Sequence, residues 1–145
     1  QVNLGLMYYQ GEGVPRDYQE ALKWWRKAAD QGDADAQFNL GLSYEKGLGV
    51  PQDYQEAFKW FQMAAGQGDA EAQFNLGYMY AKGQGVPRNY VLAHVWMNLS
   101  LSQQTDEAMI KAKARALDKL ESRMTRTEIS EAQKLAWEFK PTARF

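Results

Sequence analysis

The residues best spaced for catalysis in this sequence are a serine and a lysine. Ser43 and Lys46 have the Ser-x-x-Lys spacing in which a lysine assists a serine nucleophile in acyl transfer. The Ser-Asp-Asn and Lys-Thr-Gly motifs that complete such an active site do not occur in the sequence. Ser43 is also expected near a helix C-terminus, where backbone carbonyls destabilise an oxyanion. The pair therefore supplies a nucleophile and a base, but not the rest of an acyl-transfer site.

Two further patterns favour structure over chemistry. His94 is the only histidine and falls at a position of helical spacing where apolar residues are expected, so we predict a packed ring with one hydrogen bond. The run Gly-x-Gly-Val-Pro occurs three times, beginning at Gly11, Gly47 and Gly83. A phosphate-binding loop would follow a strand and open a helix, whereas a helix is expected before each of these runs. We therefore predict a helix C-cap and a tight turn at each one.

The composition excludes several classes of function. The 145 residues include no cysteine, which excludes disulfides, thiol catalysis and thiolate metal sites. The formal net charge of −1 provides no electrostatic basis for binding nucleic acid. No apolar stretch approaches the roughly 18 residues that a membrane-spanning helix needs. We therefore expect no cofactor, no metal, no nucleic-acid partner and no membrane span.

A repeat of 36 residues organises the expected secondary-structure elements along the chain. Asparagine, tyrosine and tryptophan recur at this spacing, and each asparagine is followed by Leu-Gly. The three sets are Asn3, Asn39 and Asn75; Tyr8, Tyr44 and Tyr80; and Trp24, Trp60 and Trp96. Such regularity indicates three copies of one structural unit.

Each unit has the pattern of two helices. In the second copy, Asp33 is placed to cap the first helix and Gly47 to end it. Asp53 and Glu56 form the capping-box pattern at the start of the second helix. The glycine at 41 is expected to let the two helices approach closely. The expected apolar faces contain Ala36, Leu40, Gly41 and Tyr44 in the first helix, and Ala57, Trp60, Phe61 and Ala64 in the second.

The sequence after residue 104 leaves the repeat but remains helical. A helix start is expected around Thr105 and Asp106, and a second capping box is formed by Thr125 and Glu128. Pro141 should stop the last helix. This hairpin carries many charges, which suits a cap with one face in solvent: Lys111, Lys113, Arg115, Lys119, Glu121, Arg123 and Lys134.

The repeat resembles the Sel1-like repeat family, a subclass of the tetratricopeptide-like arrays. The pattern that carries the resemblance is Ala-x-Ala-Gln-x-x-Leu-Gly-x-x-Tyr-x-x-Gly-x-Gly-Val, followed by an Asp, an Ala and a Trp, and its best copy runs from Ala34 to Gln67. The resemblance implies an all-α, right-handed α/α superhelix (solenoid) of helical hairpins. It also implies a single domain over 1–145, with repeats at 1–32, 33–68 and 69–104 and a capping hairpin at 105–145.

The same resemblance implies a non-enzymatic scaffold or adaptor that holds a protein or peptide partner. In such arrays the first helix of each pair lines a concave groove. Phe38, Phe74, Leu42 and Tyr78 are the residues we expect to contribute most to binding. Apolar side chains of this kind suit an amphipathic helix or an apolar peptide anchor. The full set of expected groove residues is Val2, Leu6, Tyr9, Asp35, Phe38, Leu42, Glu45, Glu71, Phe74 and Tyr78.

Several alternatives stay open at this point. The phenylalanine column could pack between neighbouring first helices instead of facing a partner. A second functional class is a hydrolase directed at β-lactams or peptidoglycan, using Ser43 and Lys46. A third is a structural or regulatory segment of a larger protein, since Gln1 aligns with Gln37 and the first repeat is expected to lack its first turn. We expect a monomer, and the sequence indicates no compartment.

Overall fold

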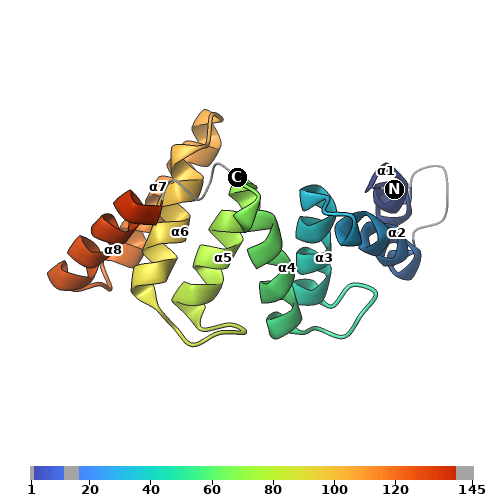
Figure 1. The fold of residues 1–145 in the computed structure, drawn as a ribbon, viewed down its shortest axis with the longest axis horizontal. Helices are drawn as coiled ribbons and strands as arrows, with labels where there is room; N and C mark the ends of the chain where they lie inside the picture. Colours follow the sequence, from blue (N-terminus) through green and yellow to red (C-terminus); the bar gives the residue numbers. More distant parts are fainter. Residues whose placement is uncertain (1, 12–16, 140–145) are drawn as a thin grey trace. The chain divides into compact units, whose positions relative to one another are not determined.

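The computed structural model describes residues 2–11 and 17–139, and every regular element in them is an α-helix. This confirms the predicted all-α class (Figure 1). The helices that alternate along the repeats and the terminal hairpin are α1 (Val2–Gln10), α2 (Tyr18–Asp30), α3 (Ala34–Lys46), α4 (Tyr54–Gly66), α5 (Ala70–Lys82), α6 (Tyr90–Ser102), α7 (Glu107–Glu121) and α8 (Arg126–Phe139).

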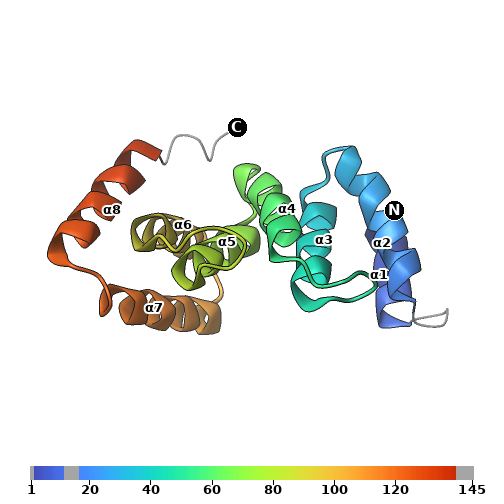
Figure 2. The same cartoon turned by 90° about the horizontal axis from the view of Figure 1, so that it is seen from below.

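The chain divides into two compact units, Gln1–Ala64 and Ala65–Phe145. In the first unit, α2 packs against both α1 and α3. In the second unit, α6 is the central helix, because α5, α7 and α8 all pack against it (Figure 2). The helices α7 and α8 thus continue the second unit beyond the last repeat.

A glycine in each first helix sets the approach of its partner helix. A Cβ atom added to Gly41 would lie 2.6 Å from two atoms of the Phe61 ring, and that ring is fully buried. Gly5 faces Trp25, and Gly77 faces Met97, in the same way. The predicted close approach of the paired helices is confirmed. In each pair, the side chain that packs against the glycine belongs to the residue 20 positions later in the sequence.

In the second and third repeats, the N-cap residue of the second helix closes the loop between the two helices. The Asp53 carboxylate accepts a hydrogen bond from the Glu56 N–H at 3.1 Å, as the capping box predicts. The Asp53 N–H, however, donates to the carbonyl of Tyr44 at 2.9 Å, so the reciprocal half of the box is not made by Glu56. Asn89 donates to the Tyr80 carbonyl in the same manner, at 2.9 Å. The cap therefore ties the start of the second helix to the end of the first.

The predicted helix ends are largely confirmed. Gly47 and Gly83 adopt left-handed backbone angles, with φ of 71° and 70°, and end α3 and α5 as C-caps. The Thr125 N–H donates to the Glu128 carboxylate at 2.8 Å, and the Glu128 N–H donates to the Thr125 hydroxyl at 3.0 Å, so this capping box is complete. Asp106 is the residue that caps α7. Pro141 lies outside the described residues.

Candidate functional site

The exposed apolar and aromatic residues of the expected groove occupy one repeat position of the first helices. Leu6 in α1 exposes 38% of its surface, and Tyr78 in α5 exposes 44%. Leu42, at the same position of α3, is half-buried. The side chain of Val2 lies outside the described part of the structure. Each unit therefore presents a large apolar or aromatic side chain at this position to solvent.

The two phenylalanines are half-buried and contact the core of their own units. The Phe38 ring lies 5.7 Å, centroid to centroid, from the ring of Phe61 in α4. Phe74 packs against a cluster that contains Ala93 and Met97. Each of these rings therefore contributes to packing as well as to the surface, and substitution there alters stability together with any binding.

The remaining residues of the expected groove differ in their surroundings. The Tyr9 ring lies 5.5 Å from the ring of Trp25, inside its own hairpin, whereas Asp35 is exposed. Glu45 is half-buried, and this burial raises the pKa of its carboxyl, while the neighbouring Lys46 lowers it by a smaller amount. The first unit therefore offers one exposed carboxylate at the start of α3 and a partly shielded one near its end.

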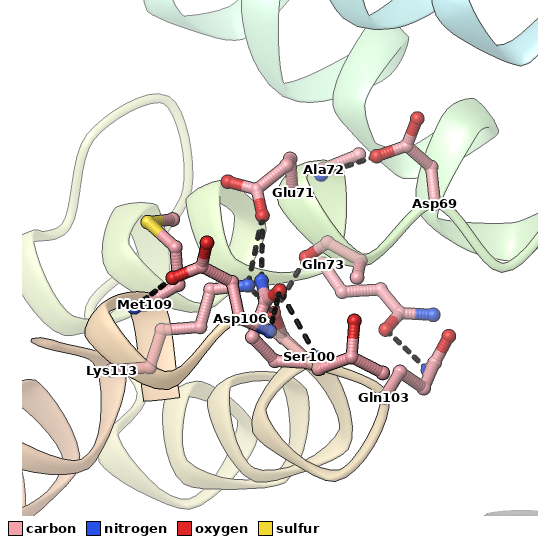
Figure 3. Close-up of polar contacts among 12 residues, drawn as sticks. Asp69, Glu71, Ala72, Gln73, Ser100, Gln103, Asp106, Met109 and Lys113 are labelled. Carbon is pink, nitrogen blue, oxygen red and sulfur yellow. Dashed lines mark hydrogen bonds and ion pairs between the residues drawn. The ribbon is translucent and has the colours of Figure 1, made fainter. Parts of the chain in front are cut away.

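Glu71 is held by an ion pair that the sequence analysis did not anticipate. The Lys113 ammonium lies 2.9 Å from the Glu71 carboxylate and donates to the Ser100 hydroxyl at 2.9 Å (Figure 3). The Ser100 hydroxyl in turn donates to the Ala70 carbonyl at 2.6 Å. Gln104 adds a hydrogen bond to the Glu71 carboxylate at 3.3 Å. Three helices, α5, α6 and α7, are joined by these bonds.

Lys113 corrects the prediction that the charges of the terminal hairpin face solvent. Its side chain is only 2% exposed, and its ammonium also lies 5.6 Å from the centre of the Phe74 ring. A signal for this burial was present in the sequence, because Lys113, Leu117 and Leu120 share the i, i+4, i+7 face of one helix. A lysine at the head of an apolar stripe points inward when a carboxylate is within its reach.

His94 is a packed ring with one hydrogen bond, as predicted. It is buried in α6, and its Nε2 lies 2.6 Å from a carboxylate oxygen of Glu121 in α7. Within the described residues, the Nδ1 atom has no hydrogen-bond partner. Glu121 is thus a second charged residue of the terminal hairpin that contacts the core. It falls four residues after Leu117, on the same inward stripe as Lys113.

The Ser43 hydroxyl is engaged inside its own helix. Ser43 is 2% exposed and donates to the Asn39 carbonyl at 3.0 Å, whereas Lys46 is exposed. A substrate would have to displace packed side chains to reach this hydroxyl. Within the described ranges, no group of three or more His, Asp or Glu residues is placed to hold a metal ion. None of the described helices is long and apolar enough to cross a membrane.

The second unit contains a pocket between α5, α6 and α7 with a volume of about 130 Å³. Its floor is apolar and includes Met97 and Leu120, which are buried. Tyr78 and Tyr90 also line it. Its remaining lining residues are Ala81, Ala116, Lys82, Lys119 and Arg123, of which the last three are exposed. Tyr78 therefore belongs both to the expected groove and to this pocket.

These α/α hairpins, closed by a glycine on one helix and a large side chain on the next, define a helical-repeat protein. The chain belongs to the Sel1 repeat family, whose model, described as Sel1 repeat, matches residues 1–33, 34–69 and 70–104. Proteins with this fold are typically non-enzymatic scaffolds for protein–protein interaction.

Two solved structures show how the chain compares with known members. It is 42% identical to a Sel1 repeat protein from Oxalobacter formigenes, with a TM-score of 0.69, over 70% of this chain and 42% of that one. It is 34% identical to c5321, a protective antigen of uropathogenic Escherichia coli that displays an SLR fold, with a TM-score of 0.86, over 98% of this chain and 29% of that one. These likenesses confirm the helical-repeat solenoid. The chain spans less than half the length of either protein. None of the curated protein sequences matches it significantly.

Proposed function

We propose that this chain is a non-enzymatic interaction module that binds a partner protein or peptide through the exposed face of its first helices. The observation that supports the proposal most strongly is the exposure of Leu6 and Tyr78 at equivalent positions of α1 and α5. Folding does not require a large apolar side chain at a position that it leaves in solvent. Tyrosine in particular contributes strongly to protein interfaces, because a large amphipathic ring is ordered at little entropic cost.

The surrounding residues extend this surface within each unit. In the first unit, Leu42 and Phe38 lie half-buried on α3, and Asp35 adds an exposed carboxylate at the start of that helix. In the second unit, Phe74 lies half-buried on α5, one turn before Tyr78. All of these side chains project from regular helices. Because their backbone is ordered by folding, binding does not carry that entropic cost.

A capture experiment tests the proposal. The wild-type chain and a Leu6→Glu/Tyr78→Glu variant would be immobilised and exposed to a lysate of the source organism, and bound proteins identified by mass spectrometry. Met63→Glu is the matched control, because Met63 is an apolar residue, 49% exposed, on a second helix, α4. A protein bound by wild type and by the control but lost by the double variant supports the proposal. A protein bound equally by all three contradicts it.

A further inference from the structure

The pocket between α5, α6 and α7 combines an apolar interior with a basic rim, in which the Lys82 ammonium lies 5.5 Å from the centre of the Tyr78 ring. Lys82, Lys119 and Arg123 line its edge, and no carboxylate is among its described lining residues. No ion pair joins any of these three cations to a carboxylate in the described part of the chain. Lys113, in contrast, is buried and paired with Glu71. The second unit therefore uses Lys113 of α7 to hold its core, whereas Lys119 of α7 and Arg123, two residues beyond the end of that helix, line the pocket without an ion pair to a described carboxylate.

Helix electrostatics accounts for part of this arrangement but not for all of it. Lys82 stands in the last turn of α5 and Lys119 in the last turn of α7, where a cation stabilises the helix C-terminus. Such a cation needs no cavity beside it. Here the cations surround a hollow whose floor is formed by Met97 and Leu120, and an apolar hollow of this kind is a place for a side chain to enter.

The size of the pocket limits what it can accept. Its volume of about 130 Å³ is close to that of engineered apolar cavities that admit a benzene ring, roughly 150 Å³. One aromatic or branched aliphatic side chain fits this space. Tyr78 and Tyr90 in the lining offer aromatic contacts to an inserted ring. Carboxylates on either side of that group would meet the basic rim.

We propose that this pocket binds an acidic peptide segment, with one aromatic or branched aliphatic side chain inserted between Tyr78 and Leu120 and flanking carboxylates against Lys82, Lys119 and Arg123. The inference rests on the proposed function, because Tyr78 belongs to the surface assigned there, and it names the chemistry of the partner. Charge complementarity favours an acidic segment, because a basic one would be repelled by three cations that form no ion pair with a described carboxylate.

A titration of the full chain with defined peptides tests this chemistry. The probe is the capped peptide Ac-Glu-Asp-Glu-Phe-Glu-Asp-Glu-NH2, whose blocked C-terminus leaves only side-chain carboxylates. One comparison peptide replaces Phe by Ala, and another replaces every acidic residue by Lys. Binding would be followed by amide chemical shifts in NMR spectra at about 20 mM and about 300 mM NaCl, because exposed ion pairs weaken as the screening length shortens.

Two variants separate the rim from the interior. Lys119→Glu/Arg123→Glu reverses the rim charge, and Ala116→Leu fills the interior without changing any charge. Lys111→Glu is the matched control, because Lys111 is an exposed lysine of α7 that does not line the pocket. Circular dichroism would verify that all variants fold. We expect about tenfold weaker binding for each pocket variant and for the Ala peptide, less than about a twofold change for the control, and weaker binding at high salt.

Several results would overturn the inference. These are an acidic peptide that does not bind, a charge-reversed variant that binds as well as Lys111→Glu, preferential binding of the lysine peptide, or a dimer of the free chain that the pocket variants dissociate. If the acidic peptide does not bind, but Leu6→Glu/Tyr78→Glu still fails to bind a partner protein that wild type captures, only the acidic chemistry of the pocket is rejected. If Leu6→Glu/Tyr78→Glu and Lys119→Glu/Arg123→Glu both still bind the captured partner, and wild type binds the acidic peptide, the proposed surface is rejected and the pocket proposal is retained.

Discussion

Replacing Gly41 by alanine tests the packing that defines each hairpin. The added methyl group would lie 2.6 Å from the Cδ1 and Cε1 atoms of Phe61 and 3.0 Å from its Cζ atom. Carbon atoms in contact prefer a separation of about 3.5–4.0 Å, so the ring or the helix has to move by roughly 1 Å. Phe61 is fully buried and its ring lies 5.7 Å from that of Phe38, which leaves little room for this movement.

The magnitude follows from two opposing effects. Forcing an extra methyl group into a well-packed core costs about 1–3 kcal/mol of unfolding free energy. Alanine in place of glycine inside a helix raises the free energy of unfolding by about 1 kcal/mol. We therefore expect Gly41→Ala to lower the free energy of unfolding by up to about 2 kcal/mol, measured by urea denaturation followed by circular dichroism.

Gly66→Ala is the matched control for this substitution. Gly66 is the last residue of α4, and a Cβ atom there would meet nothing within 4 Å. This variant should be as stable as wild type or up to about 1 kcal/mol more stable. Combining Gly41→Ala with Phe61→Leu should recover part of the loss that the two single variants predict by addition. A Gly41→Ala variant as stable as Gly66→Ala would refute the close approach of α3 and α4.

Three further predictions concern individual side chains. Lys113→Ala should lower the free energy of unfolding by about 2–4 kcal/mol, because it leaves the Ser100 and Glu71 oxygens without their buried donor. Lys111→Ala, an exposed control on the same helix, should change it by less than about 0.5 kcal/mol in the same denaturation experiment. Because burial raises the pKa of the Glu45 carboxyl, the folded state favours its protonated form, and stability from this group is present at acidic pH and lost as the pH rises above 4.5. Glu45→Gln should therefore stabilise the chain at pH 7 by less than about 1 kcal/mol and lose this advantage at about pH 3, and an equal gain at both pH values would contradict the assignment. Wild type and Ser43→Ala should show the same absence of nitrocefin turnover, since the Ser43 hydroxyl is buried and donates to the Asn39 carbonyl; turnover that only wild type shows would restore the hydrolase alternative.

The sequence was sufficient to predict the helices of the repeats because each feature appears in three copies. Asp33 caps α3, Gly47 ends the same helix with a positive φ, and Gly41 faces a buried ring, all as the spacing indicates. These are local effects, in which the residue type and its neighbours within one or two turns decide the conformation.

The contacts of the terminal hairpin were not predictable in the same way. Beyond residue 104 the repeat no longer supplies a register, so the sequence indicates an apolar face of α7 but not which residues of other helices that face meets. Lys113 and Glu121 were interpreted as solvent-facing charges, yet each is held by a residue far away in the sequence, Glu71 and His94 respectively. Pairing across 27 and 42 residues depends on the packing of whole helices. The same limit explains why the sequence does not predict the pocket beside Tyr78, since three separate helices contribute residues to it.

The most direct test of the central claim is the affinity of the captured partner for a Tyr78→Ala variant, measured by isothermal titration calorimetry beside Met63→Ala. Both side chains are large and exposed, but only Tyr78 lies on a first helix. Truncation of a tyrosine at the centre of an interface costs about 2 kcal/mol or more, which is at least about a 30-fold rise in Kd. The proposal predicts such a rise for Tyr78→Ala and less than about a twofold change for Met63→Ala. Equal dissociation constants for the two variants would contradict it.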